Sequence, residues 1–151
     1  MIVRDPRVED FIDWVDLAER AFDEGIDYWG FGADRESLER AFFLWERNPR
    51  AINYCLEQNG TLVGTICGLT FPHHFNARKW CYMEHLWYVT PEIRARGGGI
   101  KLLKKTEAEC KKRGIEHMIM ANQERFMASN FERLYPKLGY GKIESLWIKE
   151  L

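Results

Sequence analysis

Cysteine is scarce in this chain of 151 residues, and its spacing matches neither a common metal site nor a redox pair. No Cys-x-x-Cys sequence occurs anywhere in the chain. This absence argues against the usual zinc-binding and thioredoxin-type motifs, and it predicts small buried thiols in a reducing cytosol. The four thiols are Cys55, Cys67, Cys81 and Cys110.

An excess of charge of either sign is missing too. The chain has 22 basic and 23 acidic side chains, whereas a general nucleic-acid-binding domain is usually strongly basic. We therefore expect no nucleic-acid partner.

Long apolar runs are also absent. No run reaches the roughly 18 residues of a membrane-spanning helix, and the first residues, MIVRDPRVEDF, contain no apolar signal region. These features predict no membrane span and a cytoplasmic protein.

Core-forming residues, in contrast, are plentiful. Hydrophobic residues make up 46% of the chain and aromatic residues 14%, which argues against disorder. A chain of this length buries roughly 68–70% of its unfolded surface without disulfides or metals. Since the sequence shows no repeat, linker or low-complexity run, we expect a single domain over residues 1–151.

Hydrophobic spacing and punctuation residues predict an α/β fold with a mixed sheet. Asp5-Pro6 is typical of a helix cap followed by the first helical residue, and Gly25 ends that helix. Asp34 caps a second helix, and Asn59-Gly60 predicts a two-residue hairpin turn. The predicted strands cover residues 2–4, 52–56, 62–69, 80–89, 115–121 and 143–149, and later helices run from the glycine-rich loop to residue 113 and over 128–138.

The most informative stretch is Glu84–Leu103. It reads as an aromatic strand, a turn opened by Pro91, three consecutive glycines and a helix. Glycine lets the backbone adopt positive φ and approach a ligand closely. The helix that follows offers unpaired N–H groups and the positive end of its dipole, so the stretch predicts a phosphate or pyrophosphate site.

Two motifs give this chain a family resemblance. The loop Arg94–Gly99 has the pattern Arg-x-x-Gly-x-Gly between Leu-Trp-Tyr-Val and Ile-Lys-Leu-Leu, and Leu134–Tyr140 has the pattern Leu-Tyr-x-x-x-Gly-Tyr. Both resemble segments of the GCN5-related N-acetyltransferases, the GNAT family, and the resemblance covers nearly the whole chain. It implies a mixed, mostly antiparallel sheet flanked by about four helices in the order β-α-α-β-β-β-α-β-α-β.

The resemblance implies acetyl-CoA as cofactor and a primary amine as acceptor, with direct transfer in a ternary complex. It also allows a homodimer. A non-catalytic acetyl-CoA-binding sensor or interaction module of the same fold is the alternative. The loops 25–35 and 70–79 carry no signature of the acceptor, and His73-His74 lacks the acidic or cysteine partners of a metal site.

Backbone N–H groups of the strand and of the glycine-rich loop are the expected cofactor contacts, with Arg94 or Arg96 adding a charged contact to phosphate. The family often has an asparagine seven residues before its motif tyrosine. Here that position holds Ala128, and Asn130 is the candidate for the same contact. The cofactor-binding residues implied are Trp87, Tyr88, Val89, Arg94, Ala95, Arg96, Gly97, Gly98, Gly99, Ile100 and Asn130.

Tyr135 and Glu84 are the expected catalytic residues. The resemblance places Tyr135 near the sulfur as the acid for the leaving thiolate, and the reference pKa values of about 10 and 8.5 suit that transfer. Glu84 is the one carboxylate in the apolar strand 80–89, and burial would raise its pKa toward that of a useful base. His85 and Tyr82 are alternatives, because a bulge in this strand changes which side chains face the cleft.

Overall fold

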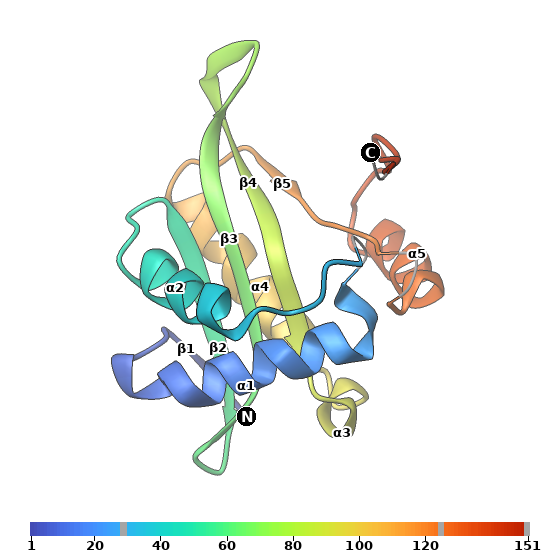
Figure 1. The fold of residues 1–151 in the computed structure, drawn as a ribbon. Helices are drawn as coiled ribbons and strands as arrows, with labels where there is room; N and C mark the ends of the chain where they lie inside the picture. Colours follow the sequence, from blue (N-terminus) through green and yellow to red (C-terminus); the bar gives the residue numbers. More distant parts are fainter. Residues whose placement is uncertain (28–29, 124–125, 150–151) are drawn as a thin grey trace.

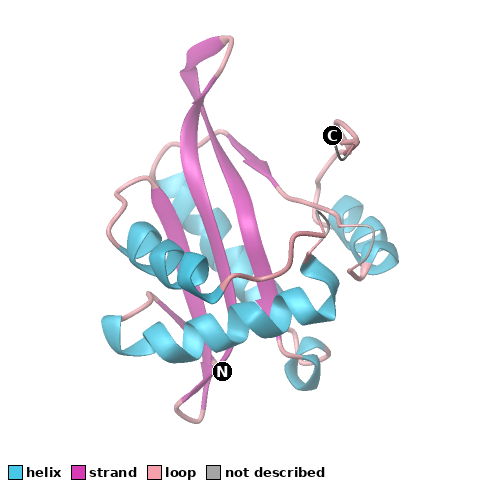
Figure 2. Ribbon diagram, viewed as in Figure 1, coloured by secondary structure: helices cyan, strands magenta, loops and turns pink. Residues whose placement is uncertain are grey.

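The structure, a computed structural model, describes residues 1–27, 30–123 and 126–149. Within these residues a five-stranded sheet carries helices on both faces (Figures 1 and 2). The α/β fold with a mixed sheet is therefore confirmed.

The strands follow one another across the sheet in chain order. Successive pairs from β1 to β4 are antiparallel, whereas β5 pairs parallel to β4. The β2–β3 connection confirms the predicted hairpin, with positive φ at Asn59 (54°) and Gly60 (81°). The strands are β1 Ile2–Arg4, β2 Ala51–Gln58, β3 Thr61–His73, β4 Asn76–Val89 and β5 His117–Ile119.

The helices cover the sheet unevenly. Helices α1 and α2 lie on one face and α4 on the other, while α5 stands beyond the β5 edge (Figure 1). Asp34 caps α2 as predicted, because its carboxylate accepts the Ser37 N–H at 2.9 Å. The helices are α1 Phe11–Ala21, α2 Arg35–Glu46, α3 Pro91–Arg94, α4 Gly98–Lys112 and α5 Ala128–Lys137, with a 3₁₀ turn Val8–Asp10 before α1 and a π-helical turn Phe22–Ile26 after it.

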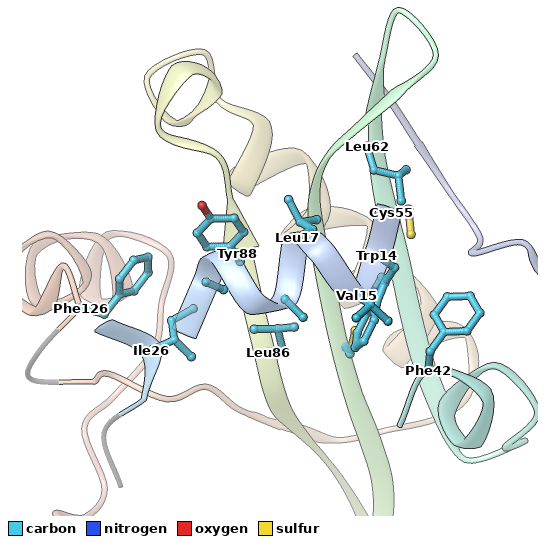
Figure 3. Packing of buried hydrophobic residues seen from close by; sticks show 13 residues of the cluster. Trp14, Val15, Leu17, Ile26, Phe42, Cys55, Leu62, Leu86, Tyr88 and Phe126 are labelled. Carbon is cyan, nitrogen blue, oxygen red and sulfur yellow. The ribbon is translucent and has the colours of Figure 1, made fainter. Parts of the chain in front are cut away.

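Two apolar clusters hold the layers together. In the first, Trp14 and Val15 of α1 pack on Cys55 and Leu86 of the sheet (Figure 3). The second lies under α4. Each fully buried aliphatic side chain stabilises the fold by about 1.5–3 kcal/mol. All four cysteines are buried free thiols, as predicted.

Two local predictions are wrong. The first helix does not begin at Asp5-Pro6, because the Arg7 N–H bonds to the Asp10 carboxylate at 2.7 Å and regular α-helix starts only at Phe11. Residues 143–149 form no strand. That segment leaves α5 away from the β5 edge (Figure 1), so its backbone meets no partner strand in the described part of the chain, and Trp147 is 96% exposed.

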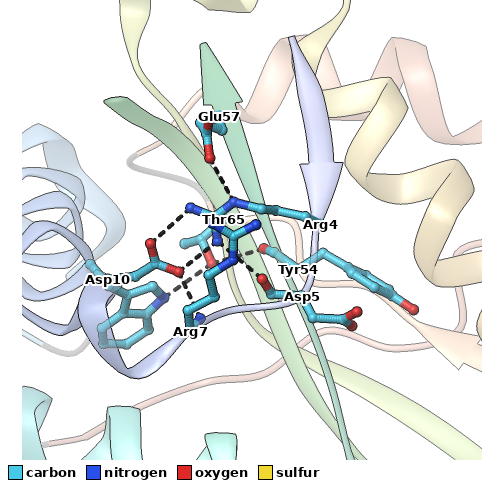
Figure 4. A network of polar contacts seen from close by, with 8 residues as sticks. Arg4, Asp5, Arg7, Asp10, Tyr54, Glu57 and Thr65 are labelled. Carbon is cyan, nitrogen blue, oxygen red and sulfur yellow. Dashed lines mark hydrogen bonds and ion pairs between the residues drawn. The ribbon is translucent and has the colours of Figure 1, made fainter. Parts of the chain in front are cut away.

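A polar network ties β1 to the sheet and to the start of α1 (Figure 4). The Arg4 guanidinium donates to both Asp10 carboxylate oxygens, at 2.6 and 2.8 Å, and to Glu57 at 2.6 Å. Burial alone would raise the pKa of Asp10, but the hydrogen bonds from Arg4 and from the Arg7 N–H outweigh it and lower that pKa. The ionised carboxylate therefore stabilises the fold.

We expect Asp10→Asn to lower the free energy of unfolding by about 3 kcal/mol near neutral pH, because it leaves Arg4 without its main partner. A carboxyl whose pKa is lowered on folding stabilises the protein at pH values above its unfolded pKa of about 3.9. This stabilisation is lost as pH falls through the folded pKa. The gap between variant and wild type should thus close in acid. Urea denaturation at several pH values measures this. Glu36→Gln, which breaks the exposed Arg40–Glu36 pair, is the control and should change little. If the difference in unfolding free energy between variant and wild type did not change with pH, the stabilising role of the Asp10 charge would be contradicted.

Candidate functional site

Strands β4 and β5 separate part of the way along their length. In the described part of the chain their ladder pairs are Cys81 with His117, Tyr82 with Met118 and Met83 with Ile119. Beyond that point the chain after β5 leaves the sheet, so the β5-facing edge of β4 from Glu84 onward has no β5 partner. A backbone edge of this kind can bind an extended ligand.

A bulge in β4 lies where the strands separate. Cys67 pairs with Leu86 and Gly68 with Glu84, so His85 is the extra residue. The bulge reverses the side-chain alternation: Tyr82 lies under α4, whereas Leu86 packs with α1. This explains why alternation in the sequence could not decide which side chains face the cleft.

The glycine-rich loop leads into α4 through Gly97, which has φ 75°. The first bond of the helix runs from the Lys101 N–H to the Gly97 carbonyl at 3.1 Å. The N–H groups of Gly98, Gly99 and Ile100 precede it in the first turn, where the helix itself supplies no acceptor. Three N–H donors at the positive helix end suit a pyrophosphate.

The glycines differ in what a side chain would meet. A Cβ on Gly98 would lie 2.6 Å from the buried Leu56 side chain, and a Cβ on Gly99 would lie 3.3 Å from the Trp87 ring. At Gly97 there is open space. Only Gly97 and Gly99 can therefore test the loop without direct damage to the core.

Gly97→Val should weaken coenzyme A binding on the order of 10²-fold, since added bulk and a disfavoured positive φ move the N–H groups of the loop. The matched control is Gly114→Val, at the other end of α4, with φ 71° and equally open space. Both variants should lose similar stability, but only the first should lose affinity. Calorimetric titration and thermal melts measure the two effects, and equal affinities in the two folded variants would overturn the phosphate-loop assignment.

The two arginines of the loop differ in their surroundings. The Arg94 guanidinium donates from Nε to the Val89 carbonyl at 2.8 Å and from Nη2 to the Glu24 carboxylate. The Arg96 side chain is exposed. Of the two, Arg96 is the one whose charge faces solvent beside the loop.

Glu84 lies at the point of strand separation and is 8% exposed. Burial raises the pKa of this carboxyl to about 7, although the hydrogen bond from the Ala121 N–H, at 3.2 Å, acts in the opposite direction. No ion pair to Glu84 is found among the described residues. A carboxyl with this pKa can accept a proton near neutral pH. It lines a small pocket together with Ile26, Trp87, Ala121, Gln123, Phe126 and Phe131.

Tyr135 of α5 reaches the same place from the other side. Its hydroxyl donates to the Ala121 carbonyl at 2.7 Å, so Glu84 and Tyr135 bind the N–H and the C=O of one residue. Burial, followed by the nearby Glu84 charge, raises the pKa of Tyr135 above the usual value. We expected the pKa values of the Tyr135 phenol and the thiol to be close, and for the free protein this is wrong. The phenol stays protonated, but it is a weaker acid than expected.

The remaining expected residues have mixed surroundings. The Trp87 ring lies 5.4 Å from the Phe131 ring and 6.4 Å from the Tyr135 ring, measured between centroids. Asn130 is exposed, and its oxygen accepts from Arg133 at 2.8 Å. Ala95, also exposed, joins α3 to the glycines.

Several expected side chains do not line the pocket. The Tyr88 hydroxyl bonds to Glu24 at 2.5 Å, and the Val89 side chain packs in the α4 cluster. The alternative base Tyr82 is fully buried in that same cluster, while His85 stacks on Trp45 at 6.1 Å.

Sequence reasoning missed three residues of this region: Glu24, Ala121 and Gln123. Glu24 meets Arg94 across 70 positions of sequence, and Ala121 acts through its backbone, so neither carries a local signal. The Gln123 Oε1 atom is buried and has no hydrogen-bond partner in the described part of the chain. A buried acceptor of this kind calls for a partner, and Gln123 lines the pocket with Glu84.

Two other classes of site are not found. Among the residues that the structure describes, no group of three or more His, Cys, Asp or Glu side chains lies close enough to hold a metal ion. No described helix combines the length and the apolar character needed to cross a bilayer.

Comparison with known proteins identifies the family. A sequence model of the "Acetyltransferase (GNAT) family" matches residues 12–140. No curated protein sequence matches.

Solved structures share the fold over nearly the full length. A transcriptional regulator from Bacillus halodurans C-125 has a TM-score of 0.80 at 16% identity, with 99% of each chain covered. A predicted acetyltransferase from Clostridium acetobutylicum, solved with acetyl-CoA, has a TM-score of 0.78 at 19% identity, covering 99% of this chain and 95% of that one. AAC(6')-Iy, in complex with a coenzyme A bisubstrate analogue, has a TM-score of 0.78 at 12% identity, covering 99% and 97%.

Proposed function

The chain belongs to the GNAT acetyltransferase family, and from that premise we propose that it transfers an acetyl group directly to a primary amine in a ternary complex. Its cosubstrate is acetyl-CoA, and acetyl transfer is its general chemistry. The proposal concerns the amine, the direct route and the residues that carry the reaction.

The observation that carries this proposal is the shared residue Ala121. Its N–H donates to Glu84 and its C=O accepts from Tyr135. One peptide segment therefore aligns a carboxyl with a pKa of about 7 and a protonated phenol at the mouth of the separated strands. The pairing of a base and an acid at one cleft suits acyl transfer to an amine.

In the proposed reaction Glu84 takes a proton from the acceptor ammonium, directly or through one water. The amine nitrogen then attacks the thioester carbonyl carbon and forms the new C–N bond. Backbone N–H groups of the free β4 edge stabilise the oxyanion. As the C–S bond breaks, Tyr135 gives its proton to the leaving thiolate, and the attacking nitrogen, which still carries one proton more than the amide, releases it to solvent. The products are the N-acetylated amine and coenzyme A, and solvent exchange restores both side chains.

The pocket also bears on the acceptor. Apart from Glu84 and Gln123, the side chains that line it are apolar or aromatic. Two oxygen acceptors among apolar walls suit an amine attached to an apolar or aromatic carbon frame. The two oxygens can accept hydrogen bonds from the N–H groups of the amine, and the walls can contact its frame. A highly polar polycation would find few partners among these residues.

The test is release of the coenzyme A thiol from acetyl-CoA against a panel of amines. Aromatic and aliphatic monoamines, aminoglycosides, peptide N-termini and lysine peptides would be compared. We expect amine-dependent thiol release and an N-acetylated product by mass spectrometry. Tight acetyl-CoA binding with no release for any amine would favour the alternative, a non-catalytic acetyl-CoA sensor.

A further inference from the structure

The Arg94 side chain makes contacts that its place in the motif does not predict. Besides its bonds to Val89 and Glu24, the guanidinium lies over the rings of Tyr88 at 5.3 Å and Phe126 at 5.1 Å. It is thus surrounded by a carboxylate, a carbonyl and two aromatic faces. The carboxylate and the aromatic rings all attract a cation.

These contacts join separate parts of the chain around the cleft. Glu24 belongs to the π-helical turn Phe22–Ile26 after α1, in which Gly25 has φ 107°. Val89 and Tyr88 form the end of β4, and Phe126 lies between β5 and α5. The Tyr88 and Phe126 rings lie 6.3 Å apart between centroids, and Figure 3 shows both near Ile26.

The same parts line the pocket. Ile26 comes two residues after Glu24, and both Ile26 and Phe126 share the pocket with Glu84. The Tyr88 hydroxyl shares the Glu24 carboxylate with Arg94. Burial would raise the pKa of Glu24, but these hydrogen bonds lower it, so the carboxylate is ionised. An ion pair that is three-quarters buried on both sides fixes geometry more firmly than an exposed one.

We propose that Arg94 is a positioning residue. Glu24 holds its guanidinium in place, and the guanidinium fixes the end of β4 and Phe126 on the two sides of the cleft. In this role it sets the shape of the space that receives the pantetheine arm and the thioester, and it does not bind the phosphates through its side chain. The exposed Arg96 is the side chain left for the phosphates. The inference rests on the proposed direct transfer of the acetyl group to an amine.

A truncated donor separates the two roles. S-acetylpantetheine carries the same thioester and arm as acetyl-CoA but has no phosphates or nucleotide. A phosphate ligand matters only for acetyl-CoA, whereas a residue that shapes the cleft matters equally for both donors. We therefore compare kcat/KM for the two donors in Arg94→Gln and Arg96→Gln.

For Arg94→Gln we expect a loss in kcat/KM of about tenfold to 10²-fold with both donors, because an altered cleft binds the arm less tightly and misplaces the reacting groups. For Arg96→Gln we expect a loss confined to acetyl-CoA and expressed in KM. A loss in Arg94→Gln that is confined to acetyl-CoA would overturn the proposal, as would full activity with both donors.

Two further variants guard against a general folding defect. Glu24→Gln removes the partner without touching the motif and should reproduce the Arg94→Gln pattern, with the double variant no worse than either single one. Glu92→Gln breaks the exposed Arg20–Glu92 pair, which joins α1 to the helix α3 that carries Arg94, and should leave both donors unaffected. Additive losses in the double variant would contradict the Glu24–Arg94 link.

Failure of the proposed function would look different. If wild type turns over neither donor with any amine, acetyl transfer to amines is wrong, and calorimetric affinities of the same variants for the two donors still test the Arg94 role. A parallel loss of both affinities supports positioning, and a loss for acetyl-CoA alone contradicts it.

Discussion

Tyr135→Phe should lower kcat on the order of 10²-fold while acetyl-CoA affinity changes little. The ring keeps its packing against Phe131 at 5.4 Å, but the proton for the leaving thiolate is gone. General acid catalysis contributes factors of this size. Because burial raises the pKa of Tyr135, its phenol stays protonated near neutral pH, and its ionisation should not add a pH dependence there. Steady-state kinetics with acetyl-CoA and the preferred amine measures the effect.

Tyr140→Phe is the matched control for this variant. The Tyr140 ring lies 5.4 Å from that of Tyr135, and its hydroxyl donates to Glu107, away from Glu84 and Ala121. Both variants lose one hydroxyl with one hydrogen bond, which costs about 1 kcal/mol of stability. Only Tyr135→Phe should lose turnover. A kcat within a factor of about two of wild type would show that Tyr135 is only structural.

Glu84→Gln should lower kcat by about 10²- to 10⁴-fold and should not destabilise the protein. Gln keeps the shape and can still accept the Ala121 N–H, but it cannot take a proton. When folding raises the pKa of a carboxyl, the folded protein loses stability as pH rises through that range. For Glu84 the range runs from the unfolded pKa of about 4.3 to the folded pKa of about 7. Above that range the buried charge costs about 4 kcal/mol, which the Gln variant avoids.

The two effects together separate a base from a structural carboxylate. A catalytic Glu84 predicts a variant that melts at or above the wild-type temperature and turns over slowly. A Glu84 that only fills its place in the structure predicts a variant that is as stable but keeps its specific activity. Thermal melts and initial rates on the same preparations decide between them, and the second pattern would make His85 the next residue to test.

The sequence predicted much of the fold because its signals are local. Asn59-Gly60 and Asp34 act within a few residues of themselves, and the structure has the hairpin and the cap they predict. The glycine-rich turn into α4 was recognisable for the same reason. Residues 143–149 were mispredicted because alternating apolar residues indicate a strand only if a partner edge lies beside them.

The cleft was harder to predict because it depends on distant pairings. The bulge at His85 reverses the side-chain alternation of β4, and no spacing in the sequence marks it. Glu24 meets Arg94, and Glu84 meets Ala121, only after the sheet has formed. The motif identified Arg94 but not its surroundings, which is why a phosphate contact was expected for its side chain.

The pH dependence of kcat/KM, which reports the ionisations of the free enzyme, in wild type and Glu84→Gln tests the central claim most directly, namely that Glu84 is the base at this cleft. A base must be deprotonated to act, so wild-type activity should rise with pH through an acidic limb near the Glu84 pKa of about 7. In Glu84→Gln this limb should disappear, leaving a low rate that is nearly flat over the same range. The same limb at the same position in the variant would contradict the assignment of Glu84 as the base.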